Sequence, residues 1–212
     1  MKLLIIICAH EFNSSCCNYI KIIDDYAKLL DMEIDYCGIS NQDDFHNYEN
    51  IIKFKYKIVN TKKQFSKICD FLTDYKTELD YDWYMKIRPD LKLLEKFNFD
   101  ILSTNAVNAR ARVYYGPKKI KNGMSVNGAG QWRHIGDCRY SNHEHSIILD
   151  DMLFIFHKNI LQMGAFDKVN LSTYENEWIQ SGVFNERKIP QNVIGIYFEN
   201  TKHRVFSGDV NM

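Results

Sequence analysis

The chain of 212 residues is long enough for one full-sized domain and short for two. Its composition, with 45% hydrophobic, 25% charged and 14% aromatic residues, is typical of globular proteins and excludes a disordered or collagen-like chain. Lys+Arg and Asp+Glu number 27 each, so the formal net charge is zero, which disfavours nucleic acid as the main ligand.

The N-terminal segment predicts a buried strand. Residues 2–8, KLLIIIC, form a continuous apolar run of the kind found in parallel sheets. The run imitates a signal peptide, but His10 and Glu11 follow it without a small-residue cleavage site. No segment approaches the roughly 20 apolar residues of a membrane span. The six cysteines show no framework spacing, so we expect buried free thiols in a reducing compartment.

Helices and strands alternate over the next part of the chain. After the turn AHEFNSS we expect a helix over about 15–31, a strand over 32–39 and a polar loop over 40–50. Residues 51–59 alternate, with Lys53, Lys55 and Lys57 on one face. These lysines could bind phosphate, but the solvated face of an edge strand guarded by lysine is the stronger interpretation.

The remaining elements complete an α/β pattern. We expect a helix over about 62–76 capped by Thr61, strands over 82–88 and 107–115, a glycine-rich loop over 122–130, a short buried strand over 152–157, helices from Lys158 and over 172–188, and a last strand over 192–198. The pattern predicts a single Rossmann-like domain over residues 1–212, with a mainly parallel central sheet flanked by helices. Ligands bind such sheets at the carboxyl ends of the strands.

The triplet Arg88-Pro89-Asp90 directly follows a buried strand. A carboxylate at Asp90 could hold Mg²⁺ or Mn²⁺ if the phosphate oxygens of a ligand complete the coordination shell. Alternatively, Asp90 is a surface residue that pairs with Arg88 in a turn. The nearby D-x-D pattern of Asp80–Asp82 precedes the strand, so it would lie at the wrong end of the sheet, in the turn that leads into the strand.

The segment YDWYMKIRPDLKLL resembles the metal-binding segment of GT-A glycosyltransferases. In the beta-1,3-galactosyltransferase branch this segment reads Asp-aromatic-apolar-apolar-Lys-x-Asp-Asp-Asp-apolar. Residues 82–86 match the first part, and Asp90 falls on the last Asp, which carries the metal in that family. Arg88 and Pro89 replace the first two acidic residues. Many bacterial and viral sugar transferases, such as the small GT-A domains encoded by chlorella viruses, are similar to this chain, with Arg-Pro-Asp in the same place.

The resemblance implies a nucleoside site near the first strand. The loop Ala9-His10-Glu11 would cradle the base and the ribose, largely through backbone groups, with His10 as the stacking partner. The region around residues 36–40, including Cys37 and Gly38, would complete this site. The alternative for the first loop is an ordinary strand–helix turn.

The resemblance also implies residues for the phosphates and the chemistry. Asp150 or Asp151 would orient the sugar or, in an inverting enzyme, act as the general base; the alternative is a cap. Arg88 would face the phosphates. His203 would be a further metal ligand, with Lys202 or Arg204 reaching the diphosphate.

Two arginines and a loop complete the candidates. Arg110 and Arg112 lie on the same face of their strand, so both line the cleft or both face water. His134, Cys138, His143 and His145 could bind zinc, although the spacing matches no common zinc site and scattered loop residues explain it better. Trp132 in the same region could stack on a sugar, so acceptor recognition is the preferred role of this loop.

The predicted function is therefore transfer of a hexose from a nucleotide-diphosphate donor to an acceptor hydroxyl on a glycan or glycoprotein, with Mn²⁺ or Mg²⁺ as cofactor. UDP is the expected nucleotide because it is the commonest in this family. Residues 1–100 would form the nucleotide-binding half and residues 101–212 the acceptor-side half. The alternatives are a nucleotide- or carbohydrate-binding module without turnover and a metal phosphohydrolase that uses the His/Cys cluster. We expect a cytoplasmic location, in the host if the chain is viral and serves viral glycan synthesis.

Overall fold

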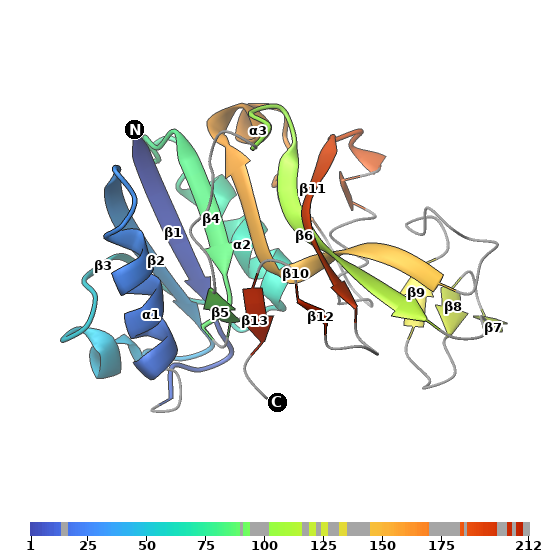
Figure 1. The fold of residues 1–212 in the computed structure, drawn as a ribbon. Helices are drawn as coiled ribbons and strands as arrows, with labels where there is room; N and C mark the ends of the chain where they lie inside the picture. The colour runs from blue at the N-terminus through green and yellow to red at the C-terminus, as the bar shows by residue number, and fades with distance from the viewer. Residues whose placement is uncertain are drawn as a thin grey trace.

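A computed structural model describes residues 1–13, 17–89, 91–93, 102–115, 119–121, 124–126, 132–134, 145–169, 183–184, 186–198, 203–204 and 207–209. A largely parallel central sheet lies between helices, as the sequence predicts (Figure 1). Within these residues the main sheet has eight strands in the order β12-β11-β6-β10-β4-β1-β2-β3. None of the helices described combines the length and the apolar character that crossing a membrane would require.

The first half of the chain builds the parallel part of the sheet. Its elements are β1 (Lys2–Cys8), α1 (Cys17–Ala27), β2 (Glu33–Ser40), the 3-10 helix η2 (Phe45–Tyr48), β3 (Phe54–Val59), α2 (Gln64–Asp74) and β4 (Trp83–Ile87). Both α-helices are shorter than predicted. The N-cap of α2 is Lys63, whose side chain makes no capping hydrogen bond, so the predicted cap at Thr61 is wrong.

Strand β3 forms one edge of the main sheet in the described part of the chain. Its lysines are exposed and paired: Lys55 Nζ lies 2.6 Å from Asp35 Oδ2, and Lys57 forms an ion pair with Glu49. The lysine row is therefore the solvated face of an edge strand, as the stronger interpretation holds.

The second half joins the other side of β4. Its elements are β5 (Leu91–Leu93), β6 (Val107–Tyr115), β7 (Lys119–Lys121), β8 (Met124–Val126), β9 (Trp132–His134), β10 (His145–His157), α3 (Lys158–Gln162), β11 (Gln191–Phe198), β12 (His203–Arg204) and β13 (Ser207–Asp209). β10 begins earlier than the predicted strand over 152–157. β8 forms within the predicted glycine-rich loop, so that part of the loop is a strand. The helix predicted over 172–188 lies largely outside the described residues.

The core has two layers because side chains alternate across the sheet. Leu3, Ile5 and Ile7 of β1 pack with α1 on one face, and Leu4 and Ile6 pack with α2 and α3 on the other (Figure 1). This double burial explains the continuous apolar run at the N-terminus.

Three of the cysteines are buried free thiols, as predicted: Cys8, Cys37 and Cys69. Burial raises the pKa of Cys69 to about 12. A thiol with so high a pKa is a poor nucleophile, so Cys69 is a structural residue.

Candidate functional site

The carboxyl ends of β1, β2, β3 and β4 lie along one edge of the sheet, because these strands are parallel neighbours. β4 leaves this edge through Arg88, which is half-buried, and Pro89, which is buried. The backbone N–H of Arg88 donates to the carbonyl oxygen of Met152 at 3.0 Å and so ties the triplet to β10. Asp90 itself lies outside the described residues.

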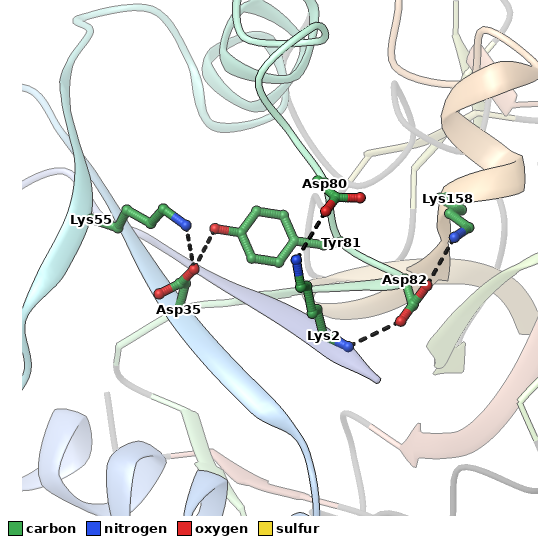
Figure 2. Close-up of polar contacts among 7 residues, drawn as sticks. All are labelled: Lys2, Asp35, Lys55, Asp80, Tyr81, Asp82 and Lys158. Atoms are coloured by element: carbon green, nitrogen blue, oxygen red, sulfur yellow. Dashed lines mark hydrogen bonds and ion pairs between the residues drawn. The ribbon is translucent and has the colours of Figure 1, made fainter.

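The D-x-D pattern lies at the opposite edge, as predicted from the strand direction. Asp80 Oδ2 accepts a hydrogen bond from Lys2 Nζ at 2.9 Å, while Asp82 accepts hydrogen bonds from the Lys2 backbone N–H at 3.0 Å and from Lys158 Nζ at 2.8 Å (Figure 2). The hydrogen bond from Lys2 lowers the pKa of Asp80, and that from Lys158 lowers the pKa of Asp82. Both carboxylates are thus used to join β1, β4 and α3.

Asp150 and Asp151 lie in a break of the sheet beside the carboxyl end of β4. The pairing of β10 with β6 shifts between Leu149 and Phe154. The residues of β6 opposite these two are Ala111 and Ala109, so residues 150–153 of β10 lie opposite residue 110 alone. Bulges of this kind are frequent next to active sites, where they redirect side chains.

A second register shift lies at the same place. The pairing of β11 with β6 shifts between Val193 and Gly195, and Gly195 is the partner of Arg110. Arg110 therefore lies between two irregular strands. The backbones of Arg110, Asp150 and Asp151 gather near Arg88, which the sequence alone could not indicate.

The predicted nucleoside loop, residues 9–11, lies against the end of β2 and continues to residue 13. The Ala9 N–H donates to the Ile39 carbonyl at 2.9 Å, and the His10 carbonyl accepts from the Asn41 N–H at 3.0 Å and from Ser40 Oγ at 3.3 Å. The side chains of His10 and Glu11 are exposed. The loop thus has an ordered backbone and presents its polar side chains to solvent.

Two charged residues beside this loop are absent from the candidates that the sequence indicates. Lys67 of α2 is 1% exposed, and its Nζ donates to the Ala9 carbonyl at 3.1 Å and to Asn41 Oδ1 at 2.5 Å. Asp44 is 6% exposed and accepts from the Phe12 N–H at 2.6 Å. A lysine inside the apolar stretch QFSKICDFL was the available signal for Lys67, whereas Asp44 stands in a polar loop without any signal.

Burial at this place has a different consequence for each of the two groups. Desolvation lowers the pKa of Lys67, against the opposing effect of Cys8 and Asp44. The Oδ1 atom of Asp44 is buried and has no hydrogen-bond partner in the part of the chain that the structure describes. Such atoms are rare in folded proteins and need an explanation.

Two other candidates of the nucleoside site face the core. Cys37 is 0% exposed and packs in the layer of α2, so its side chain is not available to a ligand. Gly38 is buried, and a Cβ at its position would lie 2.9 Å from the ring of Phe45 and 3.0 Å from that of Phe54. Any contact of these two residues with a nucleoside would have to use backbone groups.

Lys86, in the segment that resembles the GT-A motif, is also buried at 0% exposure. Its Nζ lies 5.5 Å from the centroid of the Phe154 ring, a distance at which a cation and an aromatic face attract. Lys86 therefore belongs to the core between β4 and β10.

The C-terminal segment comes close to the Arg88-Pro89-Asp90 triplet at Asp209 and not at His203, the predicted metal ligand. His203 is in β12, and β11, β6 and β10 separate that strand from β4, which corresponds to about 19 Å at the usual strand spacing of about 4.8 Å. In contrast, β13 pairs with β5, and Asp209 lies opposite Leu91, the residue after Asp90.

Arg112, the other arginine predicted on β6, lies outside the two register shifts. Its partners are Ile148 of β10 and Tyr197 of β11.

The metal and acceptor candidates remain predictions. Among the described residues, no group of three or more His, Cys, Asp or Glu side chains could hold a metal ion. Trp132 and His134 are in β9 and His145 starts β10, whereas Cys138 and His143 lie outside the described residues.

Comparison with known proteins indicates a fold and no sequence family. The chain matches no sequence model of a known protein family and no curated protein. A nucleoside-diphosphate-sugar pyrophosphorylase from Vibrio cholerae RC9 has a TM-score of 0.52 at 10% identity, over 93% of each chain. A 4-diphosphocytidyl-2C-methyl-D-erythritol synthase has a TM-score of 0.53 at 9% identity, over 97% of this chain and 93% of the other. The likeness is one of fold.

A viral structure is also similar. A glycosyltransferase involved in the glycosylation of the major capsid of PBCV-1 matches over 90% of this chain and 80% of its own, at 8% identity. Its TM-score of 0.45 is too low to carry an argument. The comparisons confirm the predicted fold class, a mainly parallel GT-A-like α/β sheet.

Proposed function

We propose that the chain is a metal-dependent glycosyltransferase of the hexosyltransferase type. It moves a sugar from a nucleotide-diphosphate donor, with UDP-sugars as the first candidates, to a hydroxyl group of a glycan or glycoprotein. One observation carries the proposal. The first loop, the exit of β4 at Arg88 and the bulge at Asp150–Asp151 lie at the same edge of a GT-A-like sheet, where the parallel strands end. The similarity in fold to a nucleoside-diphosphate-sugar pyrophosphorylase is consistent with a nucleotide-sugar ligand.

The residues divide the work between binding and chemistry. A divalent cation held by Asp90 would offset the charge on the nucleotide diphosphate as the bond to the sugar breaks. Residues 9–11 and the end of β2 hold the nucleoside, and Arg88 and Arg110 face the phosphates. Asp150 or Asp151 orients the sugar or takes the proton from the acceptor hydroxyl.

A thermal-shift screen tests the donor site. UDP, GDP, CMP and dTDP are added with and without Mn²⁺ to the wild type and to Asp90→Ala. A ligand at 100 times its dissociation constant stabilises the folded state by about 2.7 kcal/mol, which is easily measured. We expect a nucleotide shift that requires Mn²⁺ and is absent in Asp90→Ala.

The matched control is Asp80→Ala, which removes an aspartate of the D-x-D pattern at the opposite edge of the sheet. This variant should retain the full nucleotide shift. If no nucleotide gives a metal-dependent shift, Arg88-Pro89-Asp90 is only a turn and the proposal is wrong.

A binding module without turnover is the second candidate, because Arg88 stands where the resembling family has an acidic residue. Release of UDP from UDP-sugars separates the two. An enzyme should lose this activity in Asp90→Asn, whereas a module would show no release in any variant. Zinc in the purified protein would instead favour a phosphohydrolase that uses the His/Cys cluster.

A further inference from the structure

The buried lysine of α2 has no role in the chemistry proposed above. Lys67 is 1% exposed, and its ammonium group donates to the Ala9 carbonyl and to Asn41 Oδ1, on the two loops that follow β1 and β2. Partial burial of a lysine is common, but full burial is rare unless the charge is paired. A residue that is costly to bury at the edge of a candidate site calls for an explanation.

The loop that Lys67 contacts is held at almost every residue. Ala9 bonds through both its N–H and its carbonyl, and the His10 carbonyl accepts from the loop after β2. The Phe12 N–H donates to Asp44, and the Phe12 carbonyl accepts from Asn47 Nδ2 at 3.3 Å. The Asn13 carbonyl accepts from the Tyr48 hydroxyl. These bonds leave the side chains of His10 and Glu11 exposed on a fixed backbone.

Lys67 differs from the other anchors because one charged group joins two loops. Replacing a buried ion pair by apolar residues of similar volume is often neutral or stabilising, but removing only one partner leaves the other group buried and unsatisfied. Without the ammonium group, the Ala9 carbonyl and Asn41 Oδ1 would lose a shared donor. The lysine therefore acts on the shape of the two loops that follow β1 and β2.

We propose that Lys67 is a positioning residue. By joining the Ala9 carbonyl to Asn41, it holds residues 9–13 in the shape that receives the nucleoside of the donor before the donor arrives. Preorganisation of this kind increases affinity because the ordering cost is met during folding. The inference rests on the proposed function, since it assigns this loop to a nucleotide.

Two measurements test the role, and only one needs a ligand. Hydrogen exchange at the backbone amides of residues 9–13 is compared in the wild type and in Lys67→Met, without nucleotide. The dissociation constant of UDP with Mn²⁺ is then measured for both. We expect faster exchange at this loop and at least about tenfold weaker UDP binding in Lys67→Met, because small displacements of a binding group cost this much or more.

Variants of Asn41, which accepts a hydrogen bond from Lys67, keep the test valid if Lys67→Met does not fold. Asn41 is half-buried, so Asn41→Ala should fold and should also weaken UDP binding. Asn41→Asp preserves an oxygen for Lys67 and should restore the affinity. Lys168→Met, which removes an exposed ion pair with Asp74, is the matched control and should bind UDP like the wild type.

The outcomes separate the inference from the function on which it rests. If the wild type binds UDP and Lys67→Met binds it equally well with unchanged exchange, the positioning role is wrong and the proposed function stands. If the wild type binds no nucleotide, the proposed function is wrong, and the assignment of Lys67 to a nucleoside is withdrawn with it.

Discussion

Asp35, at the amino-terminal edge of the sheet, accepts hydrogen bonds from two side chains. The Tyr81 hydroxyl and Lys55 Nζ each donate to Asp35 Oδ2 at 2.6 Å (Figure 2). Burial raises the pKa of Asp35, but the hydrogen bonds from Lys55 and Tyr81 outweigh it, and the pKa is lowered. Burial and the contact with Asp35 both raise the pKa of Tyr81, so its hydroxyl remains a donor.

Substitution of Tyr81 by Phe should reduce the change in the free energy of unfolding between neutral and acidic pH. The folded state holds Asp35 at a lowered pKa, so the stabilisation is complete above the ordinary carboxyl pKa of about 4 and is lost as the pH falls through the lower folded value. Tyr81→Phe should cost about 1.5–3 kcal/mol at pH 7, the value of a hydrogen bond to a charged group, and the cost should shrink below about pH 4. Urea unfolding of the wild type and the variant at pH 7 and below about pH 4 measures this cost.

The control is Tyr19→Phe, the same change at a half-buried tyrosine of α1. An equal loss for Tyr81→Phe at both pH values would show that the hydroxyl does not act through the charge of Asp35.

For single residues, the sequence predicted positions that follow from the direction of a strand. It missed residues whose role depends on a partner far away in the chain. The D-x-D pattern was placed correctly because Asp80 and Asp82 precede an apolar strand. Lys67 bonds to a carbonyl 58 residues away and Asp44 to an amide 32 residues away. No local pattern reports such a partner.

At the scale of elements, the end of β2 is shaped by a close approach of aromatic rings. Phe45 of η2 and Phe54 of β3 pack edge to face, with ring centroids 5.7 Å apart, against the bare Cα of Gly38. The glycine allows η2 to cover this part of the sheet. This packing is a sufficient reason for a glycine there, without any ligand.

Gly38→Ala should destabilise the protein by about 1–3 kcal/mol, the usual cost of overpacking a core. The reason is the clash of the new methyl group with the Phe45 ring at 2.9 Å. Thermal unfolding of the variant measures the loss. Phe45→Leu should cost less in the Gly38→Ala background than in the wild type, and additive losses would contradict this account.

Strands were predictable where apolar residues form a run, and helix ends and short strands were not. The runs in β1 and β4 are buried on both faces, so composition alone indicates them. α2 begins without a side-chain cap, which removes the usual signal for its start. β13 has no apolar pattern and exists through its pairing with β5, a non-local contact.

At the scale of the molecule, β4 is the strand at which the two halves of the chain meet. β1 pairs with one side of it and β10 with the other. Strands from both predicted halves therefore share a single sheet. The α/β pattern predicted this class of fold, but the antiparallel insertion of β10 beside β4 depends on pairing over a long stretch of sequence.

Removal of the last strand tests whether the tail supports the donor site. A chain that ends at Phe206 lacks β13, so β5, directly after Asp90, loses its partner. We expect the metal-dependent UDP shift to weaken, while the melting temperature without ligand changes little because the main sheet keeps all its strands. A chain that ends at Asp209 retains β13 and is the control. Equal UDP shifts in both chains would contradict a role of the tail.

The position of β4 also has a consequence for synthesis on the ribosome. β4 ends at residue 87, whereas its partner β10 spans residues 145–157. At about 5–20 residues per second, the first four strands emerge several seconds before β10. During that time an apolar strand with an open edge is available to other nascent chains. Slow or crowded translation therefore favours aggregation of this protein at the stage when only its first half exists.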